Sequence, residues 1–211
     1  MNRIYIARHG ETIWNVEGRI QGRSDPELSP RGIEQSLALL ELLKDRPLLA
    51  IYTSTLKRSI LTAQPLSHYF GLPLRQRPEL DEMAFGILEG KRVLCLDDGM
   101  REEWERFKRQ RFTYRLPQGE NYTDVIYRVQ PFIEEILRNH RDQEILIVGH
   151  RVVNLMLLAL LLRYPLEEIS KVQQENGGLY LVEKDGEVRV YHHHDGRMVE
   201  GLLIGRDIRV L

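Results

Sequence analysis

Residues 3–12 read RIYIARHGET. The apolar letters of this stretch predict a buried strand over residues 3–8, and Arg8, His9 and Gly10 come where that strand ends. Two cationic or near-cationic side chains at such a place repel each other, so a shared anion explains them better than packing does. We therefore expect an anion-binding site at the end of the first strand.

The composition is that of an ordinary globular chain. Of 211 residues, 42% are apolar and 29% are charged, and the length indicates one domain over residues 1–211 with an insertion. Thirty basic and thirty-one acidic residues give a net charge of −1. Because binders of nucleic acids or membrane surfaces usually carry a basic excess, we expect neither partner, whereas a small anionic substrate needs only a few local cations.

The compartment is inferred from cysteine usage and from the apolar segments. Cys95 is the only cysteine, so no intramolecular disulfide can form, which favours a reducing compartment. Charged residues interrupt the first fifteen positions, which therefore lack a signal-peptide core, and the apolar run 152–162 is too short to span a bilayer. We expect a cytoplasmic protein, whose oligomeric state the sequence does not indicate.

Strand and helix patterns alternate along the chain. Strands are expected at 3–8, 49–53, 74–76 and 145–148, followed by a hairpin of 179–184 with 187–192. Helices are expected at about 30–46, 56–70, 99–110, 122–140 and 152–162. This alternation predicts a three-layer α/β fold, in which a mostly parallel sheet is covered by helices on both faces. Ligands bind beyond the carboxyl ends of such strands.

Local signals set the helix ends and faces. Ser29 is a good N-cap, and Gly71 is expected to end the second helix. Apolar residues recur at helical spacing in two helices: Ile33, Leu37, Leu40 and Leu43 in the first, and Val125, Val129, Phe132 and Ile136 in the fourth. Residues 87–120 fit no simple strand–helix unit and are expected to form a small insertion over the site.

Four groups of polar residues follow predicted strands. They are Arg8-His9-Gly10, Ser54-Thr55-Leu56-Lys57-Arg58, Glu82, and Gly149-His150. Two histidines, two arginines and a carboxylate suit phosphoryl transfer. Arginine matches phosphoryl oxygens in pairs, neutral imidazole is a competent nucleophile, and a carboxylic acid can protonate the leaving oxygen.

The ordered set of motifs resembles the histidine phosphatase superfamily, which includes cofactor-dependent phosphoglycerate mutase and many phosphatases. The resemblance begins with RHGETIWN at residues 8–15. It continues through Gly22, Asp25, Leu28-Ser29, Gly32, Ser54 to Arg58, Glu82, Phe85-Gly86, Glu89-Gly90, Gly119-Glu120 and Val148-Gly149-His150. It implies a phosphoglycerate mutase-like fold, and we place the chain on the phosphatase branch.

The resemblance also assigns roles to residues. It implies that His9 is the nucleophile and becomes phosphohistidine, and that Glu82 protonates the leaving alkoxide and then acts as base for water. The phosphoryl oxygens would be bound by Arg8, Arg58 and His150, with help from Asn15; Thr12 and Gly22 are further substrate-binding candidates. No metal and no cofactor are expected, and the substrate is a small phosphorylated metabolite.

Two other activities were weighed against a phosphatase. A phosphoglycerate mutase is the closest rival, but mutases of this family are usually longer and carry a paired-arginine motif that this sequence lacks. An inactive phosphate-binding module is disfavoured because the nucleophile, the second histidine and the acid are all present. Sugar phosphates, phosphoserine, phosphoglycerate and cobamide-pathway phosphates all remain possible substrates.

For three further features of the sequence, a functional interpretation competes with a simpler structural one. Cys95 to Arg101 matches a Cys-x5-Arg phosphatase loop, but Asp97 and Asp98 would repel a phosphate dianion there, so we reject it. The run His192-His193-His194-Asp195 has zinc-binding side chains, yet an exposed or incidental strand end is favoured. Segment 101–115 carries three excess positive charges; a solvated helix face is slightly preferred over contact with a second acidic group of the substrate.

Overall fold

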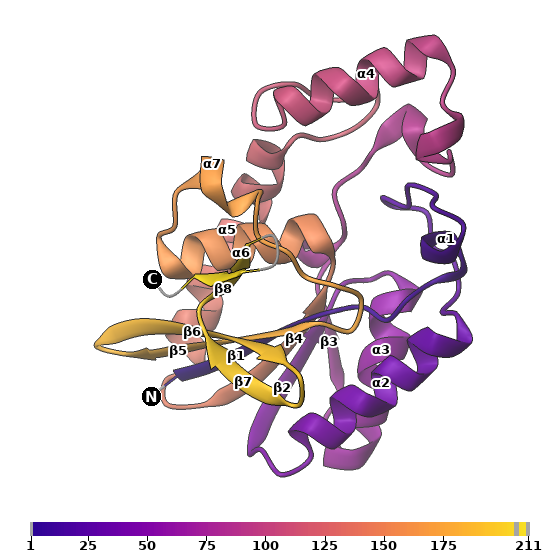
Figure 1. Cartoon of the computed structure of the whole chain (residues 1–211). Coiled ribbons are helices and arrows are strands. Elements are labelled where there is room, and N and C mark those ends of the chain that lie inside the picture. The colour runs from indigo at the N-terminus through magenta and orange to yellow at the C-terminus, as the bar shows by residue number, and fades with distance from the viewer. Residues whose placement is uncertain (1, 205–206, 210–211) are drawn as a thin grey trace.

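The computed structural model describes residues 2–204 and 207–209 (Figure 1). One seven-stranded sheet has the order β3-β2-β4-β1-β5-β6-β7, and β8 pairs with β9 separately. The strands are β1 Asn2–Arg8, β2 Leu48–Thr53, β3 Leu74–Gln76, β4 Glu144–Gly149, β5 Leu179–Asp185, β6 Glu187–His194, β7 Arg197–Glu200, β8 Leu202–Ile204 and β9 Asp207–Arg209.

The sheet is mixed. Strands β3, β2, β4 and β1 run parallel, whereas β5, β6 and β7 add antiparallel strands at one side. Arg8 lies opposite Gly149 in the β1–β4 register, and Thr53 lies opposite Val148 in the β2–β4 register. The carboxyl ends of the three central parallel strands therefore meet at one edge, as the sequence predicts.

Helices cover both faces of the sheet, so the predicted α/β fold is confirmed (Figure 1). The helices are α1 Ile13–Val16, α2 Pro30–Leu43, α3 Lys57–Phe70, α4 Asp98–Arg109, α5 Tyr122–Asn139, α6 Arg151–Leu162 and α7 Leu166–Ile169. Side chains alternate along β1: Tyr5 and Ala7 pack with α2 and α3, and Ile4 and Ile6 pack with α5 and α6. The period of two in a strand produces this division.

Helix α2 forms where expected, but only the second half of the predicted apolar face is buried. Ile33 and Leu37 are exposed, while Gly32, Ser36, Leu39 and Leu43 are buried. The reason is a close backbone approach: a Cβ at Gly32 would lie 2.0 Å from the carbonyl oxygen of Glu11. Gly32 therefore turns toward the first loop, and this contact sets the rotation of the helix. The predicted caps are confirmed, since Ser29 accepts the Gly32 N–H and Gly71 adopts φ 63°.

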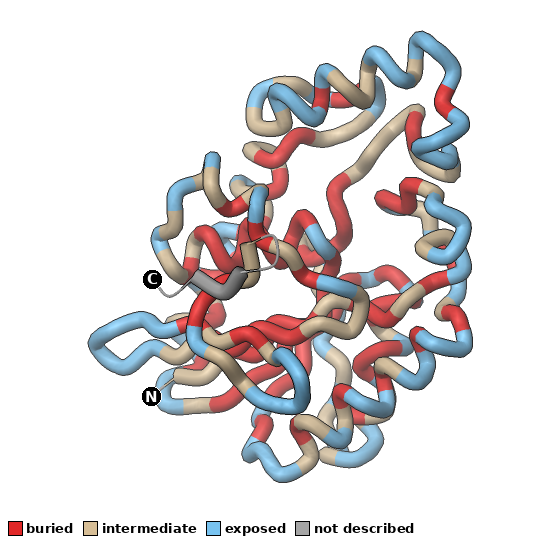
Figure 2. Tube along the Cα trace, viewed as in Figure 1, coloured by how far each residue is buried: buried red, intermediate tan, exposed pale blue. Residues whose placement is uncertain are grey.

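The chain between β3 and α5 leaves the sheet. It contains three 3₁₀ turns, η1 Pro78–Leu80, η2 Gly86–Leu88 and η3 Val93–Cys95, and then α4, which stands apart from the strands (Figure 1). Phe107 anchors α4, with ring centroids 5.8 Å from Trp104 and 6.0 Å from Phe85 and Tyr122. Most other residues of α4 are partly or fully exposed (Figure 2). In the part of the chain described, no helix is both long and apolar enough to cross a membrane.

Candidate active site

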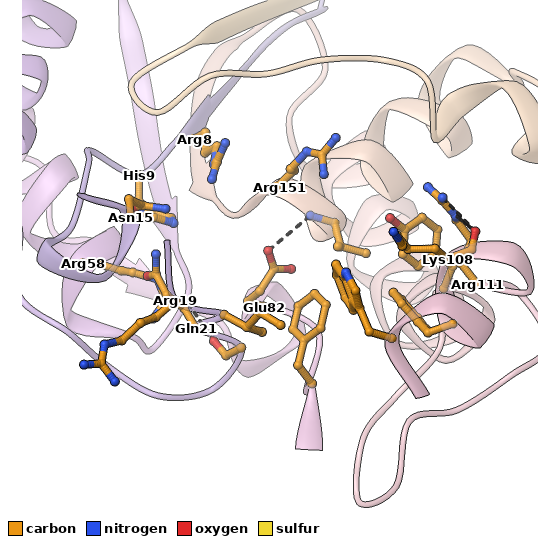
Figure 3. Close-up of a pocket in the computed structure, with 17 residues that line it drawn as sticks. Arg8, His9, Asn15, Arg19, Gln21, Arg58, Glu82, Lys108, Arg111 and Arg151 are labelled. Atoms are coloured by element: carbon orange, nitrogen blue, oxygen red, sulfur yellow. Dashed lines mark hydrogen bonds between the residues drawn. The ribbon is translucent and has the colours of Figure 1, made fainter. Parts of the chain in front are cut away.

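A cavity of about 370 Å³ lies beyond the carboxyl ends of β1 and β4 (Figure 3). Predicted site residues line it: Arg8, His9, Asn15, Gly22, Arg58 and Glu82. These residues come from segments far apart in the sequence, and the parallel strands bring them together. The predicted position of the site is therefore supported by the geometry.

His9 is held in one tautomer. Its Nδ1 lies 2.7 Å from the carbonyl oxygen of Gly10, and because a carbonyl only accepts, Nδ1 carries the proton. Nε2 of the neutral ring then keeps its lone pair, as a nucleophile requires. Burial, reinforced by the charges of Arg58 and Arg8, holds the pKa of His9 well below its ordinary value. The ring is therefore neutral at physiological pH.

His150 lies beside His9, with ring centroids 5.1 Å apart, but it is fully buried and does not line the open cavity. Its Nε2 lies 2.7 Å from Oγ of Ser54. That hydroxyl accepts the Leu56 N–H and can donate its own proton to Nε2. Nδ1 of His150 then carries the ring proton and is a buried donor with no partner among the described residues.

Two arginines supply fixed positive charge. Nη1 of Arg8 donates to the carbonyl oxygen of Gln174 at 2.8 Å. Arg58 is buried and donates to the carbonyl oxygens of Gly22 and Ser24 at 2.7 and 2.6 Å. Nε of each arginine is buried without a partner in the described chain. Burial lowers both pKa values, that of Arg8 to about 10, and both side chains stay charged at neutral pH. Unpaired buried donors beside a nucleophile suit an oxyanion.

Asn15 presents its amide nitrogen to the cavity because its oxygen is occupied. Oδ1 accepts the Thr12 N–H and hydroxyl at 3.0 Å and the Asn176 amide at 3.3 Å. Thr12 is fully buried, caps α1 and does not line the cavity. The Thr12 hydroxyl accepts the Asn15 N–H and donates to Asn15 Oδ1, so its hydrogen bonds position Asn15 and are not available to a substrate.

The loop containing Gly22 holds Arg58 and is itself fixed by Glu89. The Glu89 carboxylate accepts the N–H groups of Arg23 and Ser24 and the Ser24 hydroxyl at 3.0 to 3.1 Å. Gly22 has φ 53°, and a Cβ there would lie 2.2 Å from Oε1 of Glu89. Glycine is therefore required at the point where the loop approaches both the carboxylate and the cavity.

Two neighbouring carboxylates have different surroundings. Asp81 accepts hydrogen bonds from the N–H and hydroxyl of Thr55 and pairs with Arg23 at 3.0 Å, so it fixes the loop after β2. Glu82 lines the cavity and accepts the N–H groups of Met83 at 2.8 Å and Val152 at 3.3 Å (Figure 3). Of the two, Glu82 is the carboxylate that faces the reacting region.

The far end of the cavity is aromatic and basic. Phe85, Trp104, Phe107 and Tyr122 line the cavity together with Lys108 and Arg111, and Arg151 lies between these two cations and Arg8 (Figure 3). Of the six cations in segment 101–115, only Lys108 and Arg111 reach the cavity. Arg101 donates to the Leu96 carbonyl, Arg106 stacks on Tyr114, and Arg115 pairs with Asp124. Within segment 101–115, two cations therefore face the cavity, whereas Arg101, Arg106 and Arg115 contact other parts of the protein.

The other sequence candidates lie elsewhere. Cys95 is exposed and outside the cavity, which agrees with rejecting the Cys-x5-Arg loop. His192 is buried against Tyr180, with ring centroids 5.0 Å apart, so of the exposed or incidental strand end that was expected, exposure does not hold for this residue. Within residues 2–204 and 207–209, no group of three or more His, Cys, Asp or Glu side chains is placed to hold a metal ion.

Sequence reasoning missed the loop before β5. Gln174 accepts from Arg8 through its carbonyl and donates to the Ile6 carbonyl, and Asn176 donates to the His9 carbonyl at 3.1 Å. It also missed Arg151, whose only signal is its place directly after His150. Asn176 and Gln174 carry no local signal, because their role depends on the antiparallel strand that brings this loop to β1.

The comparisons with known proteins agree with this geometry. A family model described as "Histidine phosphatase superfamily (branch 1)" matches residues 4–195. The 6-phosphofructo-2-kinase/fructose-2,6-bisphosphatase 4 of Homo sapiens is 35% identical over 168 residues, which are 79% of this chain and 34% of that protein. The chain thus spans about a third of the length of that curated relative.

Solved structures of similar length match over nearly the whole chain. The alpha-ribazole phosphatase of Shigella flexneri has TM-score 0.80 and 29% identity, covering 99% of each chain. A mycobacterial glucosyl-3-phosphoglycerate phosphatase in complex with VO3 has TM-score 0.78 and 29% identity, covering 92% of this chain and 98% of that one. Both neighbours are phosphatases by name.

Proposed function

The chain belongs to the histidine phosphatase superfamily, and we propose that it is a phosphatase that hydrolyses a small phosphorylated metabolite through a phosphohistidine at His9. The observation that carries the proposal is the hydrogen bond from His9 Nδ1 to the Gly10 carbonyl, which leaves Nε2 with a lone pair in a cavity that two arginines line. Similarity to phosphatases of different substrates supports the reaction and leaves the metabolite open.

The proposed reaction has two displacements. Nε2 of His9 attacks phosphorus, the bond from phosphorus to the ester oxygen breaks, and Glu82 gives its proton to that oxygen. Water then attacks the phosphohistidine and gives a proton to Glu82, the bond from phosphorus to Nε2 breaks, and inorganic phosphate leaves. Arg8, Arg58, Asn15 and His150 Nδ1 donate to the phosphoryl oxygens, where charge develops in both steps.

The test is covalent trapping. Rapid acid-free denaturation after mixing with a labelled phosphate ester should yield protein-bound phosphate that is stable to base and labile to acid. His9→Ala should show neither this adduct nor turnover, whereas His68→Ala, which removes an exposed histidine on α3, should show both. Substantial turnover by His9→Ala would refute the mechanism.

The same experiment separates a phosphatase from a phosphoglycerate mutase. A phosphatase passes the labelled group to water, so the label accumulates as inorganic phosphate. A mutase passes it to a second metabolite, and inorganic phosphate stays a minor product. We expect inorganic phosphate to be the main product with every substrate that labels His9.

A further inference from the structure

The cavity holds more positive charge than one phosphoryl group uses. Six Arg and Lys side chains line it, against a single carboxylate, that of Glu82. The six are Arg8, Arg19, Arg58, Lys108, Arg111 and Arg151. Arg8 and Arg58 lie close enough to His9 for their charges, together with burial, to lower the pKa of its imidazole. The presence of the other four cations in the cavity is not explained by binding of a single phosphoryl group.

Two of the four are neutralised by the protein. Arg19 pairs with Glu17, and Lys108 pairs with Glu105 at 2.7 Å. Arg111 and Arg151 have no carboxylate partner within 4.0 Å in the described chain. Nε and Nη2 of Arg111 donate to the Lys108 carbonyl at 3.3 and 2.9 Å, so its guanidinium is fixed in position but keeps its charge.

Arg151 lies between the two ends of the cavity. It is the first residue of α6, directly after His150. Its charge acts at both ends: burial lowers the pKa of Arg8 and Arg151 lowers it further, whereas burial raises the pKa of Tyr122 and Arg151 partly opposes that rise. Figure 3 shows the same placement, with Arg151 between Arg8 on one side and Lys108 and Arg111 on the other. No hydrogen bond or salt bridge to another described residue restrains the Arg151 side chain.

We propose that Arg151 and Arg111 bind a second anionic group of the substrate, which is therefore a phosphomonoester carrying a further phosphate or carboxylate. The proposal rests on the proposed function and narrows its substrate class. Two guanidinium groups offer paired donors that suit either oxyanion. The organic part of the substrate would lie against the aromatic side chains of the same cavity, among them Phe85 and Trp104.

Matched substrate pairs test the proposal. 3-Phosphoglycerate differs from glycerol 3-phosphate by a carboxylate, and hexose 1,6-bisphosphate differs from hexose 6-phosphate by a phosphate. The parent protein should have the higher kcat/KM for the doubly anionic member of at least one pair, and the pair that responds identifies the anion. Arg151→Gln and Arg111→Gln should lower that ratio about tenfold or more, mainly through KM, since a charge-assisted hydrogen bond contributes about 1.5–3 kcal/mol.

Two variants control for loss of charge and loss of shape. Arg109→Gln removes a cation at the end of α4, two residues before Arg111 but outside the cavity, and it should leave the ratio unchanged. Arg151→Lys keeps the charge without the planar fork and should retain part of the preference. Calorimetric Kd values of the His9→Ala protein for the same pairs give a readout that does not depend on turnover.

The outcomes separate this proposal from the one on which it rests. Equal kcat/KM and equal Kd within both pairs, or a preference that survives both glutamine variants, would overturn the second anion site. Continued labelling of His9 and phosphate release from nitrophenyl phosphate would leave the phosphatase mechanism standing in that case. Loss of labelling and release in the parent protein would instead refute the mechanism, while the Kd values would still decide whether the second anion binds.

Discussion

Nε2 of His150 lies 2.7 Å from the hydroxyl oxygen of Ser54, and this contact joins the ends of β4 and β2. Ser54→Ala should leave Nε2 buried and unpaired, at a cost of about 1–3 kcal/mol of unfolding free energy. It should also lower kcat/KM about tenfold, because the ring proton is no longer directed to Nδ1. Urea unfolding and steady-state kinetics measure the two effects.

Ser67→Ala is the matched control for Ser54→Ala. The Ser67 hydroxyl donates to the Leu72 carbonyl at 2.6 Å, at the end of α3 and away from the cavity. Its loss should destabilise the protein without changing kcat/KM. If Ser54→Ala behaves in the same way, the Ser54 hydroxyl stabilises the fold and has no role in orienting His150.

Protein stability should depend on pH through buried imidazoles, above all those of His9 and His150. Burial holds the pKa values of His9 and His150 well below 6.5 in the folded protein. As pH falls below about 6.5, the unfolded chain therefore binds protons that the folded chain does not, and the free energy of unfolding decreases. Each ring contributes up to about 1.4 kcal/mol per pH unit in that range.

Urea unfolding from pH 8 down to pH 5 measures this slope. His150→Gln should make it shallower, while His68→Gln, at an exposed position of α3, should leave it as in the parent protein. A parent protein whose stability stays constant between pH 7 and pH 5 would show that these rings bind protons in the folded state as readily as in the unfolded chain.

Vanadate should inhibit the enzyme, and chelators should not. Arg8 and Arg58 supply positive charge where a phosphoryl group would sit, and vanadate has the same oxygen arrangement as that group in transfer. A related mycobacterial phosphatase has been solved in complex with VO3. We expect competitive inhibition, weakened about tenfold or more in Arg58→Gln. Activity lost in EDTA and restored by a divalent ion would contradict metal-free catalysis.

Much of the site was predictable because its signals are local. Arg8 and His9 follow an apolar strand directly, His150 follows another, and parallel strands bring such ends to one edge. The same holds for α5, where Val125, Val129 and the other apolar residues at helical spacing are buried. In these elements, the residues that form the sequence pattern are the same residues that form the strand end or the buried helix face.

The rest depends on contacts between distant segments. Ile33 is apolar and in phase with the predicted face of α2, yet the approach of Gly32 to Glu11 turns it to solvent. Among the cations of segment 101–115, nothing local distinguishes Arg111, which lines the cavity, from Arg109, which does not. Such differences come from the way α4 packs through Phe107, and helical periodicity does not determine that packing.

Glu82→Gln should act mainly on substrates with poor leaving groups. If Glu82 is the general acid, its contribution grows with the basicity of the departing oxygen, and an alkyl phosphate expels a far more basic oxygen than nitrophenyl phosphate does. The amide retains the size of the side chain and one acceptor oxygen, which can serve either the Met83 or the Val152 N–H, but it donates no acidic proton. The phosphorylation rate with an alkyl phosphate should therefore fall about 10²–10⁴-fold, and that with nitrophenyl phosphate much less. Burst kinetics separate phosphorylation of His9 from hydrolysis of the phosphohistidine.

Asp81→Asn is a control for the neighbouring carboxylate, which is bound to Thr55 and Arg23. This substitution should affect the phosphorylation rates of both substrates alike. Equal slowing of the two phosphorylation rates in Glu82→Gln would show that Glu82 is not the general acid. Another residue of the cavity would then have to donate the proton to the leaving group.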